Sequence, residues 1–134
     1  MKEILPEPPQ SASFFNAKVF RNAAITIGLS FVGGFLVGMI RGMAEFSMNS
    51  YILLIGASNL FSITLGGVIS GLSVPRESLV RHLLAVGLLV WLFGLVNVAL
   101  GIIDFTGFIF SSVIVAACVA LGGWISGLFA NPRA

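Results

Sequence analysis

The sequence predicts an all-α integral membrane protein, a bundle of four transmembrane helices built as a tandem duplication of a helical hairpin. Three observations carry this prediction. Hydrophobic residues make up 57% of the chain and charged residues only 9%, whereas an average soluble domain has about 25% charged residues. The charges are confined to short intervals, and an eight-residue motif near the end of the second uncharged run recurs near the end of the fourth.

The uncharged runs are the predicted spans. Each approaches or exceeds the roughly 20 residues that cross a hydrocarbon core about 30 Å thick. A chain of 134 residues is too small to bury such helices in water, so the bilayer must be the solvent. The first run is expected to be a true span and not a signal peptide, because about 20 residues precede it and no small-residue cleavage site follows it. The runs cover residues 22–40, 51–72, 83–103 and 105–130.

Residues 1–21 form the predicted cytoplasmic tail. Its first part, MKEILPEPPQ, contains three prolines and few residues that could pack, so we expect an extended segment. Its second part, SASFFNAKVFR, mixes aromatic and basic residues. That mixture is typical of an interfacial helix, but it is equally compatible with a simple extension of the first span. Residues 22–134 are the membrane domain.

The recurring motif indicates that the membrane domain is duplicated. LGGVISGL at 65–72 and LGGWISGL at 121–128 share seven of eight residues at an offset of 56. The same offset aligns FLVG at 35–38 with WLFG at 91–94. The repeats therefore cover about 22–78 and 79–134. A hairpin crosses the membrane twice, so its copy enters with the same orientation and the repeat is parallel.

Basic residues in the flanks predict the orientation. Arg41 is alone on one side, whereas the other side holds the remaining six, and basic residues favour the cytoplasmic side. Both termini are therefore predicted to be cytoplasmic, in the inner (cytoplasmic) membrane. The net charge of +2 follows from this topology and gives no support for nucleic-acid binding. The six basic residues are Lys2, Lys18, Arg21, Arg76, Arg81 and Arg133.

Glycines at four- and seven-residue spacing predict close helix contacts, because helices associate in lipid through small residues that let backbones approach. There are more such glycine faces than four helices need among themselves. We therefore expect, besides membrane lipid, a partner that is another membrane subunit or a second copy of the chain. The predicted packing glycines are Gly34, Gly38, Gly42, Gly67, Gly71, Gly94, Gly123 and Gly127.

Polar residues in the spans gather toward the side opposite the termini. They could line a small vestibule with two nearby carboxylates, or they could simply hydrogen-bond between helices. No ionisable residue lies at mid-membrane, where an ion-coupled transporter would place one. The possible vestibule consists of Asn59, Asn97, Ser111, Glu45 and Asp104.

The chain contains one histidine and one cysteine, too few for the usual catalytic pairs. His82, at the cytoplasmic start of the third span, is expected to meet headgroups and water. Cys118, within the fourth span, is expected to be a buried hydrophobe. We therefore predict no metal site, no cofactor and no enzymatic activity.

The segment GGVISGLSVPRESLVRHLLAVG, from Gly66 to Gly87, resembles part of some small bacterial membrane proteins. In these a GG-x-x-x-G helix end precedes a short basic loop and an Ala-x-Gly helix. The likeness extends over about the last two-thirds of the chain. It implies the four-helix fold and no particular activity.

The absence of chemistry and the surplus glycine faces favour a non-catalytic accessory or assembly subunit of a larger inner-membrane complex. The alternative is a small passive channel or transporter that acts as a homodimer. In that case Asn59, Asn97 and Ser111 would line the path. Nothing in the sequence identifies a solute.

Overall fold

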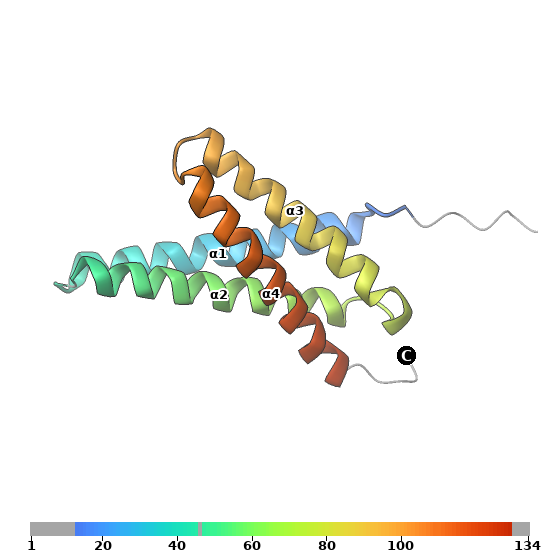
Figure 1. Cartoon of the computed structure of the whole chain (residues 1–134). Coiled ribbons are helices and arrows are strands. Elements are labelled where there is room, and N and C mark those ends of the chain that lie inside the picture. Colours follow the sequence, from blue (N-terminus) through green and yellow to red (C-terminus); the bar gives the residue numbers. More distant parts are fainter. Residues whose placement is uncertain (1–12, 46, 130–134) are drawn as a thin grey trace, which may run out of the picture.

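The computed structural model describes residues 13–45 and 47–129, where every regular element is a helix. The long helices are α1 (Ala17–Met43), α2 (Met48–Leu72), α3 (Leu79–Ala99) and α4 (Phe105–Phe129), and a short 3-10 helix, η1 (Arg76–Ser78), leads into α3. Figure 1 shows their arrangement. The prediction of four helices long and apolar enough to cross a membrane is confirmed. The predicted extended segment at 1–10 and Arg133 lie outside the described residues.

Local polar groups set the helix ends. The Asn16 side chain accepts a hydrogen bond from the Val19 backbone at 3.1 Å, and Ser47 accepts one from Ser50 at 3.2 Å, so α1 and α2 each begin behind an N-cap. Because α1 begins at Ala17, residues 17–21 are continuous with the first span. After α3 the chain passes through Gly101, whose φ of 70° lies in the left-handed region that glycine adopts easily.

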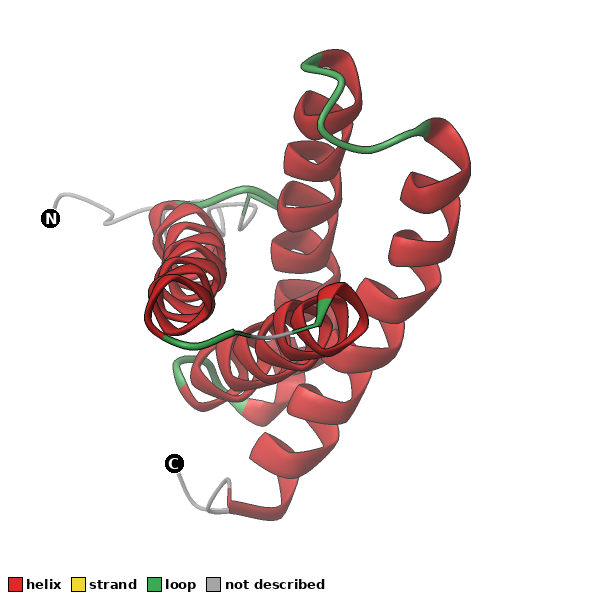
Figure 2. Ribbon diagram, turned by 90° about the vertical axis from the view of Figure 1, so that its left-hand side faces the viewer, coloured by secondary structure: helices red, strands yellow, loops and turns green. Residues whose placement is uncertain are grey.

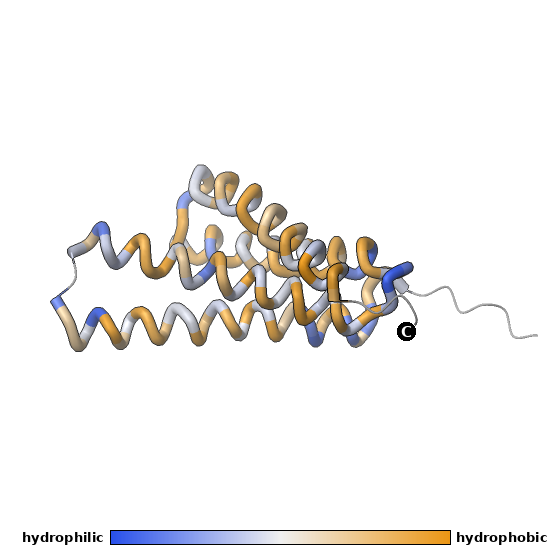
Figure 3. The backbone as a smooth tube through the Cα atoms, turned by 90° about the horizontal axis from the view of Figure 1, so that it is seen from below, coloured by the Kyte–Doolittle hydropathy of each residue, from blue (hydrophilic) through white to orange (hydrophobic). Residues whose placement is uncertain are grey.

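The helices form two antiparallel hairpins, α1–α2 and α3–α4, that cross each other at an angle (Figures 1 and 2). At one end of the molecule α1 and α3 begin and α2 and α4 end, and we call this the junction end. At the other end each hairpin closes in a loop, its tip, and the two tips diverge (Figures 1 and 2). The apolar stretches lie along the helices, and hydrophilic residues gather mainly near their ends (Figure 3).

Most buried residues lie toward the junction end. In α1 they run from Val19 to Thr26, with Val37 as the exception, and in α3 from His82 to Val86. The share of each span that is buried inside the molecule is only 17–28%. The hairpins are therefore held together near the junction end, while the tips have little contact with each other.

The two copies of the recurring motif meet where α2 crosses α4. A Cβ atom added to Gly122 would lie 2.6 Å from the Thr64 carbonyl oxygen and 2.9 Å from the Gly67 Cα atom. Both neighbours are backbone atoms, which cannot rotate away. Only glycine at position 122 allows this approach, and close backbone contact is what stabilises helix pairs in lipid.

Candidate functional site

A buried polar cluster joins three helices at the junction end, and we call it the polar junction. It consists of Asn22 and Thr26 from α1, Ser70 from α2, Ser73 just after α2, and His82 from α3. Asn22 and Thr26 are each 1% exposed, Ser70 is 0% exposed and His82 is 5% exposed. Polar side chains this deeply buried require hydrogen-bond partners.

The Asn22 amide is the centre of the polar junction. Its Nδ2 atom donates to Ser73 Oγ at 2.7 Å and lies 2.8 Å from His82 Nε2. Because an amide nitrogen only donates, Nε2 is assigned as the acceptor and the ring proton as Nδ1–H. Ser73 Oγ in turn donates to the Ser70 carbonyl at 2.8 Å, and Thr26 Oγ1 donates to the Asn22 carbonyl at 2.9 Å. One side chain thus links α1 to α3 and to the end of α2.

Two buried polar atoms in this cluster, Asn22 Oδ1 and Ser70 Oγ, make no hydrogen bond with another described residue. An unsatisfied buried polar atom costs about 1–3 kcal/mol, so these two atoms offset part of the stabilisation that the hydrogen bonds of the cluster provide. The described residues contain no group of three or more His, Cys, Asp or Glu side chains that could hold a metal ion. The chemistry of the cluster is that of hydrogen bonding between helices.

The expectation that His82 meets headgroups and water is wrong, because the imidazole points into the bundle. His82 lies three and four positions before Ala85 and Val86, both buried, and thus on the same, inward side of α3. The spacing could have indicated this, but the sequence could not show that Asn22, sixty positions earlier, would supply the partner. The expectation for Cys118 is confirmed, since it is buried.

The predicted packing glycines fall into two groups. A Cβ atom added to Gly67, Gly71, Gly94 or Gly123 would meet another helix within 3.3 Å. A Cβ atom added to any of the others would meet nothing within 4 Å. Sequence reasoning did not select Gly66, which packs against Thr26, or Gly122. The glycines that face open space are Gly34, Gly38, Gly42 and Gly127.

The residues of the possible vestibule are distributed over both hairpins. Glu45 is exposed at the α1–α2 tip, whereas Asp104 is at the α3–α4 tip, where Oδ1 accepts from the Gly107 backbone at 2.7 Å. Ser111 donates to the Phe108 carbonyl at 2.8 Å. Asn59 is exposed and Asn97 is half-buried. Within the described ranges, no hydrogen bond joins any two of these side chains.

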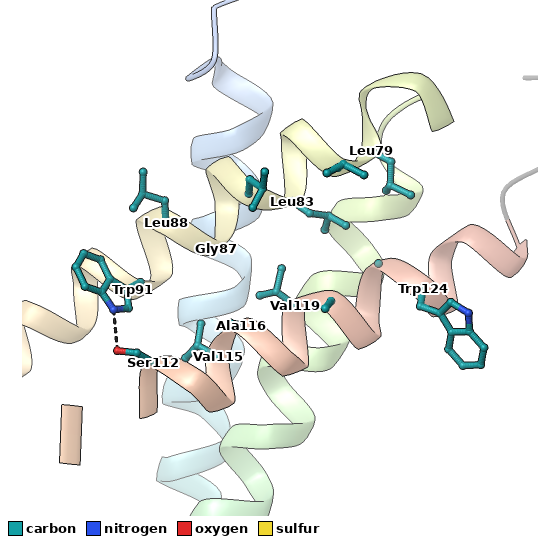
Figure 4. Close-up of a pocket in the computed structure, with 14 residues that line it drawn as sticks. Leu79, Leu83, Gly87, Leu88, Trp91, Ser112, Val115, Ala116, Val119 and Trp124 are labelled. Atoms are coloured by element: carbon teal, nitrogen blue, oxygen red, sulfur yellow. Dashed lines mark hydrogen bonds between the residues drawn. The ribbon is translucent and has the colours of Figure 1, made fainter. Parts of the chain in front are cut away.

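A groove that sequence reasoning missed lies between α3 and α4 (Figure 4). Its volume is about 640 Å³, and its walls include Leu83, Gly87, Val119 and Trp124. At its tip side the Trp91 indole donates to Ser112 Oγ at 2.7 Å and ties the two helices together. The groove exists because the helices separate from that point toward the junction end, a divergence that residue spacing does not encode (Figure 1).

These features define the class of the molecule. It is an all-helical, multi-pass membrane protein whose two hairpins are joined at one end by glycine contacts and a buried polar cluster. Comparison with protein-family models, curated proteins and solved structures found no significant match.

Proposed function

We propose that this protein is a non-catalytic accessory or assembly subunit of a larger complex in the inner (cytoplasmic) membrane. One observation carries the proposal: toward the tip of the first hairpin, an exposed asparagine shares a side with glycines that face open space, and its side chain makes no hydrogen bond with another described residue. We call Gly34 and Gly38 of α1 together with Asn59 of α2 the open face.

The geometry of the first hairpin puts these residues on one side. Gly33 packs against Ser58 across the α1–α2 contact, and Gly34 and Asn59 each follow a contact residue by one position. One residue turns a helix by about 100°. Because α1 and α2 are antiparallel (Figure 1), that turn brings both residues to the same side of the hairpin. Gly38 lies one helical turn further along α1.

The second hairpin covers the same side of α1, but only nearer the junction end. Ala23 packs with Ala85 and Val86 of α3, and the last ring contact along this side joins Phe31 to Phe93 at 5.9 Å. Beyond Phe31 the hairpins diverge. The open face begins where the cover ends, so it is accessible to another helix.

The Asn59 side chain favours binding of another protein at the open face. Counted from the start of the second uncharged run, it lies about 12 Å into the span, is exposed and makes no side-chain hydrogen bond within the described residues. Hydrocarbon offers its amide no partner. A partner helix with a polar side chain at this depth would supply one, worth about 0.6–2 kcal/mol, and the glycines would let its backbone approach.

The proposal includes a finer topology. The recurring motif supports a tandem duplication of a hairpin with repeats at about 22–78 and 79–134. The six-to-one distribution of basic residues supports cytoplasmic termini. In that orientation the polar junction lies near the cytoplasmic surface, and the open face lies in the outer leaflet.

The test is to extract the protein from its native membrane in a mild polymer, without overexpression. The mass of the intact particle is then measured and every co-migrating chain identified. We expect a mass far above a small homo-oligomer, with the same partners in each preparation. A bare homodimer would overturn the proposal and favour the passive channel, which solute flux into liposomes, lost in Asn59→Leu, would then test.

A matched pair of variants locates the interface. Gly38→Leu fills the open face, whereas Gly127→Leu fills another site at which a Cβ atom meets nothing within 4 Å. We expect Gly38→Leu to lose the partners and Gly127→Leu to keep them. Equal retention in both variants would show that the partners bind elsewhere.

A further inference from the structure

The α3–α4 groove opens sideways from the bundle, and three of its properties identify what fills it. The first is its depth. The groove runs along α3 from Leu79 to Trp91, twelve residue steps that rise about 18 Å. One leaflet of the hydrocarbon core is about 15 Å deep. The groove therefore begins at the membrane surface and ends near the middle of the bilayer, where the Trp91–Ser112 hydrogen bond closes it.

The second property is its width. A volume of about 640 Å³ spread over about 18 Å gives a mean section of about 36 Å². A helix about 10–12 Å in diameter has a section of about 80–110 Å². A polymethylene chain, whose carbon atoms contact neighbours at about 4 Å, has a section of about 20 Å². Two such chains need about 40 Å², close to the mean section of the groove. The groove therefore cannot enclose a helix, and it fits two alkyl chains that stay partly exposed to the surrounding lipid.

The third property is the charge at its mouth. The walls contain no charged side chain, but Arg76 begins the short helix η1 that leads into α3, three and four positions before the wall residues Leu79 and Val80. Arg76 is exposed and makes no ion pair or hydrogen bond with another described residue. Around it, the described part of the junction end contains three further basic residues, Lys18, Arg21 and Arg81, and one acidic residue, Glu77. A phosphate is attracted there.

We propose that the groove is a binding site for one anionic phospholipid. The two acyl chains lie between α3 and α4, with their ends near Trp91, and the phosphate lies beside Arg76. The apolar walls account for the chains, and the basic mouth selects an anionic headgroup over a zwitterionic one. This site is on the other hairpin from the open face and does not depend on the accessory role.

The protein carries its own reporters for this site, because both of its tryptophans line the groove. The purified protein is reconstituted in phosphatidylcholine vesicles that contain a minor fraction of lipid with brominated acyl chains. Bromine quenches tryptophan fluorescence on contact. We expect brominated phosphatidylglycerol to reach half-maximal quenching at about a fivefold lower mole fraction than brominated phosphatidylcholine, the preference expected for one basic residue at the surface.

Two matched pairs of variants distinguish lipid bound in the groove from lipid that contacts the rest of the protein surface. Ala116 lines the groove, and its neighbour Ala117 is exposed outside it. Ala116→Phe should remove the preference for phosphatidylglycerol, and Ala117→Phe should keep it. Arg76→Gln should reduce the preference to near unity, whereas Arg41→Gln, at the first tip, should leave it unchanged.

Equal quenching by the two brominated lipids in the native protein would overturn the proposal. So would equal effects of Ala116→Phe and Ala117→Phe, measured on variants whose helix content by circular dichroism matches the native protein. If Ala116→Phe does not fold, the Arg76→Gln result decides, because that exposed side chain supports no packing.

Discussion

The junction end and the tips are made from the same apolar helices but are held together in different ways. At the junction end, Gly67 and Gly122 pack backbone to backbone, and a histidine and an asparagine form a hydrogen bond across helices. Toward the first tip, Gly34, Gly38 and Gly42 face open space, and Asn59 has no partner among the described residues. In a bilayer, apolar side chains gain nothing by leaving lipid for protein. Small and polar residues therefore determine which helix surfaces pack against each other and which remain accessible to a partner.

Gly122→Ala should cause the largest loss of stability of any single change at the junction end. The new methyl group would meet the Thr64 carbonyl and Gly67, so we expect a loss of about 3 kcal/mol in the free energy of unfolding, the upper range for overpacking. Gly38→Ala, in open space, should be neutral or should stabilise by about 0.5–1 kcal/mol. Steric trapping in detergent micelles would measure both. An equal loss in the two variants would refute the unequal packing of the two ends.

The next largest effect should come from the polar junction. Asn22→Leu removes the partner of His82 Nε2, and we expect a loss of about 2 kcal/mol. His82→Leu should cost a similar amount. The double variant should cost about 1 kcal/mol less than the sum, because the two residues share one interaction. Strict additivity would mean that the Asn22–His82 hydrogen bond contributes nothing.

A smaller loss is expected for Trp91→Phe, which removes the hydrogen bond to Ser112 that closes the groove. Such bonds between membrane helices average about 0.6 kcal/mol. Trp124→Phe is the control, because the Trp124 indole makes no hydrogen bond within the described residues. The same unfolding measurement should show a loss only for Trp91→Phe, and a loss in both would point to ring packing instead.

The smallest effect should be that of Gly127→Ala, which compares the two repeats directly. Position 127 corresponds to Gly71 at the offset of 56, yet Gly71 packs against Ser126 and Gly127 faces open space. We expect no loss for Gly127→Ala and a loss of about 1–3 kcal/mol for Gly71→Ala. Equal losses would show that the two repeats pack alike.

Much of the fold could be predicted because the signals were local. Uncharged runs define spans by length alone, and Asp104 separates the third run from the fourth. The angle between the hairpins could not be predicted, because it depends on which glycines meet. Gly67 and Gly122 meet at that contact, yet in the sequence they are two of sixteen glycines.

The candidate site was harder to predict for the same reason. The bond between Asn22 and His82 joins residues sixty positions apart, and each alone reads as a residue at the membrane surface. The groove is harder still, since it is a space left by diverging helices. By contrast, polar residues such as Asn59 were visible as exceptions in an apolar run, although the sequence did not show which of them lack partners.

The separation between Asn22 and His82 has a consequence for biogenesis. Asn22 enters the bilayer with the first span, but its imidazole partner is synthesised only after the second span is complete. Until α3 inserts, the amide lacks the His82 acceptor, and until α4 inserts, Gly122 cannot meet Gly67. The first hairpin is therefore an unfinished intermediate on the ribosome, whose buried contacts are completed one helix at a time by the second hairpin.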